Sequence, residues 1–226
     1  MKQSNNNECI VLLSGGLDSA TVLSIAKKDF QIKALAFDYG QRHKFELIAA
    51  QNIAKNHNII LNKITIDLAQ FGKSALTDNI NVPKNQKIGK EIPITYVPVR
   101  NTIFLSYALA FAEVNEIFDI FIGVNALDYS GYPDCRPEFI KSFEKMANEG
   151  TKFSQGKNKI KIHTPLINLT KAEIITEGVK LGVDYSMTHS CYDPSKTGLS
   201  CGECDACILR KEGFNVANIT DPTNYQ

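Results

Sequence analysis

The chain has 226 residues, of which 43% are hydrophobic and 22% are charged, a balance typical of a folded globular protein. Its 25 Lys and Arg against 24 Asp and Glu give a net charge of +1, so there is no general attraction to nucleic acid or anionic membrane. No segment has the roughly 18 consecutive apolar residues of a membrane helix. The polar start MKQSNNNE is not typical of a secretory signal, and we expect a cytoplasmic protein with reduced thiols.

The first half of the chain alternates between strand-like and helix-like segments. Buried strands are predicted by the apolar runs at 9–14, 33–38 and 59–67. Helices are expected from Asp18 to Lys28 and from Lys44 to Asn56. Residues 68–95 are rich in Asn, Lys and Gly and are expected to form an irregular surface loop. This alternation indicates stacked βαβ units.

The second half continues the pattern. A long apolar helix is expected from Thr102 to about Glu116, a strand at 118–125, and a helix from Pro137 to Asn148. Thr170-Lys-Ala-Glu173 is a capping box, which predicts a helix that runs to Leu181 and stops at Gly182. We therefore predict an α/β fold, a doubly wound parallel sheet of Rossmann-like type over residues 1–184, with a small four-cysteine zinc module over residues 185–226 packed on it.

The stretch CIVLLSGGLDSATVL leads from the first predicted strand through two glycines into a helix. Main-chain N–H groups at a helix start and in a glycine-rich turn bind anions, because unpaired donors and the helix dipole act together. Ser14, Gly15, Gly16 and Ser19 are placed to hold phosphate, although the turn lacks the lysine of a P-loop. Phosphate would repel Asp18 unless Mg²⁺ lay between them, so Asp18 is predicted to bind magnesium, with a helix N-cap as the alternative.

Another polar stretch follows the fourth predicted strand, GVNALDYSGYPDCRPEF at residues 123–139. A carboxylate accepts from the N–H edge of a purine-like ring, an aromatic ring stacks on it, and Arg pairs with a carboxylate. The side chains of these types are Asn125, Asp128, Tyr129, Ser130, Tyr132, Asp134 and Arg136. A solvated surface turn is the alternative interpretation of this stretch.

Four cysteines, Cys191, Cys201, Cys204 and Cys207, follow the spacing C-x9-C-x2-C-x2-C. In a reducing compartment this spacing favours a metal site over disulfides, and four thiolates suit a structural Zn²⁺. An iron–sulfur cluster is the alternative. The nearby His189 is not expected to bind this metal. Cys135 has no evident basic partner, so we expect it to pack rather than to act as a nucleophile.

The string Ser-Gly-Gly-Leu-Asp-Ser at residues 14–19 resembles the PP-loop of ATP pyrophosphatases. Together with DYGQRH at 38–43, VPVRN at 97–101, YPDCRPEF at 132–139 and the cysteine tail, it makes the chain similar to the 7-cyano-7-deazaguanine synthase family over nearly its whole length. The chain departs from the usual family pattern at Val99, where the family has Gly before the Arg.

The resemblance implies a fold of the adenine nucleotide alpha hydrolase type with strand order 3-2-1-4, so that the loops after strands 1 and 4 flank one crevice. It also implies that 7-carboxy-7-deazaguanine attacks the α phosphorus of ATP, and that ammonia converts the adenylate to an amide. A second ATP then drives the amide to the nitrile, on the way to queuosine. Free ammonia is expected because no glutaminase domain precedes the glycines. A homodimer is implied as well.

Position and resemblance together assign the site residues. Arg100 and Lys171 are predicted to balance phosphate or carboxylate charge, because this chemistry needs Mg²⁺ and cations more than a protein nucleophile. The residues expected to bind ATP are Leu13, Ser14, Gly15, Gly16, Leu17, Asp18, Ser19, Ala20, Thr21, Val22, Leu23, Gln41, Arg42 and His43. Those expected to bind the deazapurine are Asn101, Asn125, Asp128, Tyr129, Tyr132, Asp134 and Arg136.

Two other functions stay open. A PP-loop enzyme that modifies tRNA, by thiolation or as a lysidine-type ligase, needs an RNA-binding surface, and a net charge of +1 argues against one. A non-catalytic zinc-ribbon binding module with a vestigial nucleotide loop would release no pyrophosphate. The intact Asp18 and Ser19 argue against this module.

Overall fold

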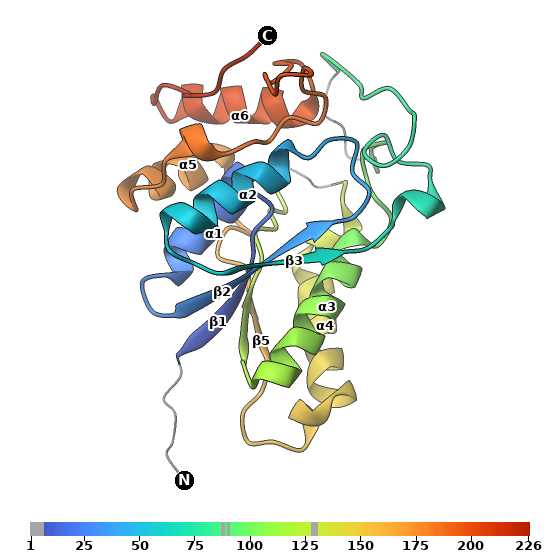
Figure 1. The fold of residues 1–226 in the computed structure, drawn as a ribbon, viewed down its shortest axis with the longest axis vertical. Helices are drawn as coiled ribbons and strands as arrows, with labels where there is room; N and C mark the ends of the chain where they lie inside the picture. The colour runs from blue at the N-terminus through green and yellow to red at the C-terminus, as the bar shows by residue number, and fades with distance from the viewer. Residues whose placement is uncertain (1–6, 87–88, 90, 128–130) are drawn as a thin grey trace.

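The structure, a computed structural model, describes residues 7–86, 89, 91–127 and 131–226. Its centre is a five-stranded parallel sheet with the strand order β3-β2-β1-β4-β5 (Figure 1). The strands are β1 (Glu8–Leu12), β2 (Gln31–Asp38), β3 (Leu61–Thr65), β4 (Asp119–Phe121) and β5 (Lys161–His163). The expected order 3-2-1-4 is confirmed, and β5 extends the sheet beyond β4.

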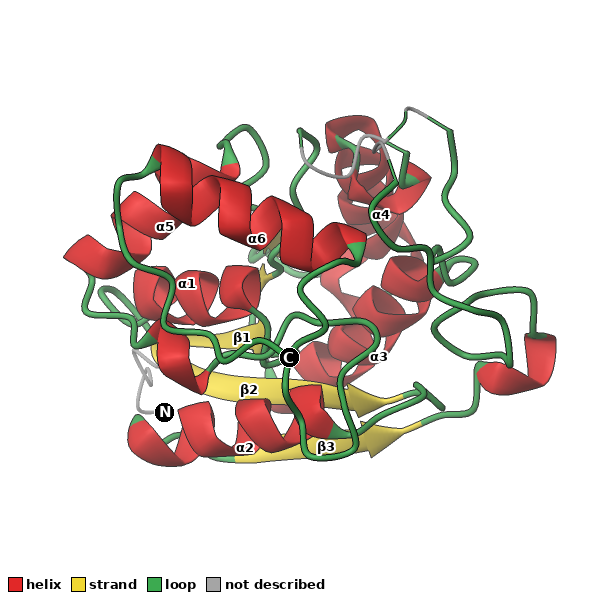
Figure 2. Cartoon of the chain, turned by 90° about the horizontal axis from the view of Figure 1, so that it is seen from above, coloured by secondary structure: helices red, strands yellow, loops and turns green. Residues whose placement is uncertain are grey.

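Helices cover both faces of this sheet, as a doubly wound fold requires. One face carries α1 (Leu17–Ala26), α2 (Phe45–Asn56), α5 (Lys171–Lys180) and α6 (Asp205–Val216) (Figures 1 and 2). The other face carries α3 (Arg100–Asn115) and α4 (Pro137–Gly150). Single-turn 3₁₀ helices are η1 (Ala69–Phe71), η2 (Pro133–Cys135), η3 (Lys152–Ser154) and η4 (Tyr185–Met187). Within the described ranges, no helix combines the length and apolarity needed to cross a bilayer.

The central strand β1 shows why the sheet was visible in the sequence. Ile10 and Leu12 belong to the core beneath α3 and α4, whereas Cys9 and Val11 belong to the core beneath α1 and α2. All four side chains are buried. A strand that is covered on both faces reads as one continuous apolar run, which is the pattern of CIVLL.

Two helix starts carry sequence signals that the structure explains. The capping box of α5 is confirmed: the Thr170 side chain accepts from the Glu173 N–H, and the Glu173 carboxylate accepts from the Thr170 N–H. Helix α3 starts at Arg100, two residues before the expected position. The residue before it, Val99, is left-handed with φ +52°. That backbone suits glycine and strains a β-branched residue, which accounts physically for the glycine of the usual family pattern.

One strand and one α-helix were not predicted. Strand β5 has only three residues, too few for a period to show. Helix α6 has Cys204 as its N-cap, so its first turn lies inside the cysteine motif, which dominated our interpretation of that stretch. Phe214 of α6 is buried in the core beneath α1, so the C-terminal segment shares a core with the main sheet.

Candidate active site

The glycine turn, residues Ser14 to Ser19, lies at the carboxyl end of β1. This strand pairs with β2 on one side and with β4 on the other, so the turn occupies the switch point where ligands bind in such sheets. Gly15 has φ +92°, and a Cβ on it would lie 2.1 Å from the Glu46 carbonyl oxygen. Only glycine fits there, and its absent side chain lets α2 pack directly against the turn.

The amides of the turn are weakly engaged. Among the described residues, the N–H groups of Gly15, Gly16 and Leu17 donate only to serine hydroxyls, at donor–acceptor distances of 3.2, 3.3 and 3.4 Å. These distances are at the long end for hydrogen bonds, so phosphate oxygens would be better acceptors. Gly16 is the N-cap of α1 and receives no side-chain cap. The start of α1 therefore presents donors to an anion.

The C-terminal segment braces this turn. The His189 N–H donates to the Gly15 carbonyl oxygen at 2.9 Å, and the Ser190 hydroxyl accepts from the Leu17 N–H at 3.4 Å. These residues come just before Cys191 in the chain. Two hydrogen bonds therefore link the glycine turn to the segment that leads into the cysteine tail.

A cavity opens beside the turn, with about 1200 Å³ of empty space including its mouth. The predicted residues that line it are Leu13, Ser14, Gly16, Leu17, Asp18, Ser19, Gln41, Arg100, Asn101, Asn125, Tyr132 and Lys171.

The remaining predicted residues lie elsewhere. Ala20, Val22 and Leu23 point into the core beneath α1, and the Thr21 hydroxyl bonds to the Tyr185 hydroxyl at 2.8 Å. Arg42 and His43 line a small recess that shares Tyr39, Gln41, Glu46, Arg100 and Tyr192 with the main cavity. Arg136, at the N-cap of α4, is exposed and outside the lining. Asp128 and Tyr129, with Ser130, lie outside the described residues.

Lys171 comes from the start of α5 and is 8% exposed. Its Nζ lies 2.7 and 2.9 Å from the two carboxylate oxygens of Asp18. A Cβ on Gly213 of α6 would lie 2.4 Å from Lys171 Cγ, so the small residue makes room for the lysine stem. The first position of a helix is usually solvated; here α6 covers it and directs the ammonium into the cavity.

Arg100 and Asn101 are presented by the first turn of α3. The Asp134 carboxylate accepts from the Asn101 N–H at 3.0 Å and so caps the helix start from a distant loop. The Asn101 side chain donates to the Asp134 carbonyl oxygen at 3.1 Å. The Arg100 guanidinium carbon lies 5.9 Å from the centre of the Tyr39 ring. Asp134 thus supports the two residues that reach the cavity rather than lining it itself.

Several polar side chains in the wall have structural partners. Gln41 accepts from the Tyr39 N–H at 2.8 Å and donates to the Phe37 carbonyl oxygen. Asn125 donates to the Leu166 carbonyl oxygen at 3.1 Å and accepts from the Leu127 N–H at 2.9 Å. Such residues shape the cavity and leave fewer side-chain groups for a ligand.

Cys135 lines the cavity without the character of a nucleophile. Burial, and to a lesser degree the neighbouring Asp134, raises the pKa of its thiol to about 12. At neutral pH it is a thiol and not a thiolate. The packing role expected for Cys135 agrees with this environment.

Sequence reasoning missed several lining residues: Phe37, Tyr39, Glu46, Phe104, Ser190, Tyr192 and Arg210. Glu46 had a usable signal, because it follows His43 by three residues and lies on the first turn of α2. Ser190 and Arg210 had none, since only the folding of the tail against β1 brings them close.

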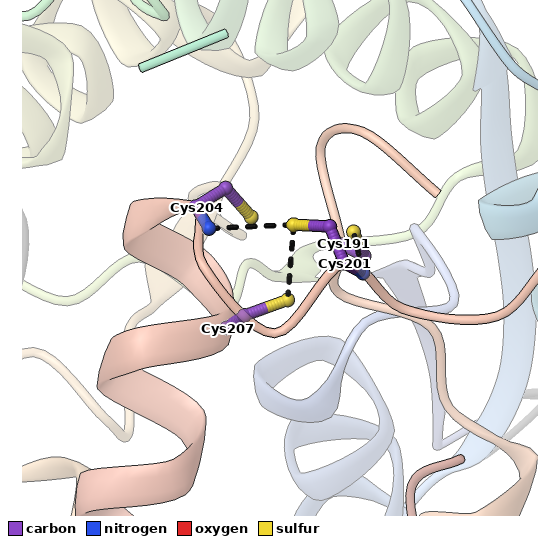
Figure 3. A group of neighbouring side chains, drawn as sticks. All are labelled: Cys191, Cys201, Cys204 and Cys207. Carbon is purple, nitrogen blue, oxygen red and sulfur yellow. Dashed lines mark hydrogen bonds between the residues drawn. The ribbon is translucent and has the colours of Figure 1, made fainter. Parts of the chain in front are cut away.

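The four tail cysteines converge (Figure 3). Their sulfur atoms all lie within 4.8 Å of one another, and all four residues are buried. Main-chain N–H groups donate to Cys191 Sγ from Cys201 at 3.1 Å and to Cys201 Sγ from Cys204 at 3.3 Å. Hydrogen bonds from the Cys191 and Cys207 side chains lower the pKa of Cys204. Buried sulfur atoms so close, with thiolate-stabilising donors, fit a metal site.

Parallel strands, a Ser-Gly-Gly-x-Asp-Ser turn at the switch point, and a cavity lined by Arg100 and Lys171 define a PP-loop enzyme that uses ATP. NMN synthetase from Francisella tularensis has a similar fold, with a TM-score of 0.52 and 20% identity over 96% of this chain and 79% of that one.

Sequence comparisons identify the family of this PP-loop enzyme. The profile of the family "Queuosine biosynthesis protein QueC" matches residues 8–218. A 7-cyano-7-deazaguanine synthase of Desulfatibacillum aliphaticivorans is 59% identical over 100% of this chain and 99% of its own length. Another, of Geobacter sp. strain M21, is 58% identical over 97% of this chain and 98% of its own. The chain belongs to the QueC family.

Proposed function

We propose that this chain is an ATP-dependent ligase that converts 7-carboxy-7-deazaguanine and ammonia to 7-cyano-7-deazaguanine, with release of AMP and pyrophosphate. The relatives reported above are 7-cyano-7-deazaguanine synthases. The observation that carries the proposal is the convergence of the glycine turn, Lys171 and Arg100 on one cavity.

In the first step the substrate carboxylate attacks the α phosphorus, and the bond to the bridging oxygen of pyrophosphate breaks. The glycine-turn amides hold the departing diphosphate, and the Lys171 ammonium offsets the charge that develops around the phosphorus. Ammonia then attacks the acyl carbon, a C–N bond forms and AMP leaves. In the second stage the amide oxygen attacks the α phosphorus of another ATP, and a second pyrophosphate leaves. The C–O bond then breaks to release AMP, and loss of the protons on nitrogen leaves the nitrile.

We further propose that the metals have separate tasks. Asp18 supplies the carboxylate that a phosphate-bound Mg²⁺ would require, and Lys171 keeps that carboxylate oriented until nucleotide arrives. The cysteine cluster, Cys191, Cys201, Cys204 and Cys207, offers the all-thiolate set that suits a structural Zn²⁺ and leaves no position for substrate. Its place in the reaction is to hold His189 and Ser190 against the glycine turn.

The test is product analysis with 7-carboxy-7-deazaguanine, ammonium chloride and Mg-ATP. The expected products are the nitrile, AMP and pyrophosphate, with two ATP consumed per nitrile. ADP and phosphate in their place would overturn the adenylation mechanism, and AMP release only with tRNA would favour a tRNA-modifying enzyme. A homodimer stays a prediction, to be tested by light scattering.

A further inference from the structure

The cavity contains a carboxylate that the proposed reaction does not use. Among the described residues, its acidic side chains are Asp18 and Glu46. Asp18 has both oxygens within 2.9 Å of Lys171 Nζ. Glu46, by contrast, makes no side-chain hydrogen bond and no salt bridge with any described residue. A half-buried carboxylate without a hydrogen-bond partner is costly, so this group needs an explanation.

Glu46 is held where a ligand can reach it. It lies on the first turn of α2, which packs on Gly15, and it lines both the main cavity and the small recess. A first-turn acid often serves only to stabilise the helix dipole, and this would lower its pKa. Here burial raises the pKa of Glu46 to about 7, only partly offset by Arg100. The helix dipole alone does not explain its position.

The surroundings indicate what the carboxylate would accept. The neighbouring wall is aromatic: Phe37 and Phe104 stack with ring centres 4.1 Å apart, and Tyr39 lies beside them. The Arg100 guanidinium shares the recess and disfavours a second cation such as ammonium. A flat, neutral ring with paired N–H donors fits aromatic walls and two free carboxylate oxygens.

We propose that Glu46 recognises the aminopyrimidine edge of the deazaguanine, accepting one hydrogen bond from the ring N–H and one from the 2-amino group. This inference rests on the proposed function and names the residue that makes the site specific for a guanine-type base. Of the carboxylates predicted for this task, Asp134 caps α3 instead, and Asp128 lies outside the described residues.

The experiment compares two substrates in the wild-type protein and in one main variant. The substrates are 7-carboxy-7-deazaguanine and the same acid without its 2-amino group, and the main variant is Glu46→Gln. The wild-type protein is expected to favour the amino compound by about 100-fold or more in kcat/KM, because a site built for hydrogen bonding rejects an analogue that leaves it unpaired. Glutamine keeps one acceptor but sets an NH₂ group against the 2-amino group. The preference should fall below about 5-fold.

The controls separate the outcomes. Glu138→Gln makes the same change on the first turn of α4, outside the cavity, and should leave both substrates unaffected. Glu46→Asp, a second variant, should keep part of the preference. KM for ATP and for ammonium should stay within about twofold in Glu46→Gln. A retained preference for the amino compound, or a selective rise in KM for ATP or ammonium, would overturn the proposal. Wild-type protein that makes no nitrile would refute the proposed function instead.

Discussion

The glycine turn and the cysteine cluster lie close together but are built from different parts of the chain. The turn offers main-chain N–H groups that β1 and α1 hold in place, so its geometry is set by packing. The cluster offers four buried side chains from a loop and the start of α6. We therefore expect the turn to form without a ligand and the cluster to depend on a metal. His189 and Ser190, which precede the cluster, hydrogen-bond to the glycine turn. We therefore expect the geometry of the turn to depend on the cysteine cluster.

The largest effect should follow from breaking the cluster. Cys204→Ser is expected to abolish zinc binding and to lower the free energy of unfolding by several kcal/mol, since structural metal binding supplies folding energy. The braced turn should loosen too, raising KM for ATP by about tenfold or more. Metal analysis, thermal unfolding and kinetics measure the three effects. Cys135→Ala, outside the cluster, should keep one zinc per chain. Loss of zinc with an unchanged KM for ATP would show that the sites are independent.

The second-largest effect should follow from removing the Lys171 ammonium beside the glycine turn. Lys171→Ala should lower kcat/KM for ATP by about 10²–10³-fold, equivalent to about 3–4 kcal/mol, because it removes a charge aimed at the reacting phosphate. The fold should persist, because the ion pair that is lost lies in the cavity wall. Lys180→Ala, at the exposed end of the same helix, is the matched control and should change nothing. Equal rates for the two variants would remove Lys171 from the reaction.

The half-buried Glu46 carboxylate makes the free energy of unfolding depend on pH. The pKa of Glu46 is raised from 4.5 to about 7 by burial, so the folded chain keeps a proton that the unfolded chain has lost. The free energy of unfolding should therefore fall as pH rises from about 4.5 to about 7 and then level off. Glu46→Gln has no titrating group at this position, and its stability relative to wild type should rise by about 3 kcal/mol across that range. Parallel stability curves for the two proteins would contradict the assignment.

A packing variant tests how the tail directs Lys171. An alanine Cβ at Gly213 would lie 2.4 Å from Lys171 Cγ and 2.9 Å from Ile175 Cδ1. Gly213→Ala should lower the free energy of unfolding by about 2 kcal/mol and weaken ATP binding, because the lysine stem must move. Gly150→Ala at the end of α4, where the nearest atom is 3.8 Å away, should cost nothing. Denaturant unfolding separates the two variants.

The smallest effect lies before α3. Val99→Gly should raise the free energy of unfolding by about 1 kcal/mol, because relief of left-handed strain exceeds the added flexibility of the unfolded chain. Val114→Gly is the control, for which a change of the opposite sign is expected. Val114 is 81% exposed on the same helix, and glycine should destabilise it by about 0.5–1 kcal/mol. Changes of the same sign at both positions would refute the strain at Val99.

The positions of the first four strands and the glycine turn were predictable because their signals are local, whereas the strand order followed from the family resemblance. Apolar runs mark strands covered on both faces, and six consecutive residues define the turn. The residues of the cavity wall opposite the turn were harder to predict from the sequence. Asp134 and Asn125 belong to an informative motif, yet their polar groups are used inside the protein. Glu46 looks like an ordinary helix acid until its neighbours are known, and Lys171 like a solvated lysine until α6 covers it.

The contact between His189 and Gly15 has a consequence for biosynthesis. The turn leaves the ribosome early, but the residues that brace it are made more than 170 positions later. The nascent chain can pair β1 with β2 long before it can complete the nucleotide site. Competence to bind ATP is therefore gained only near the end of translation.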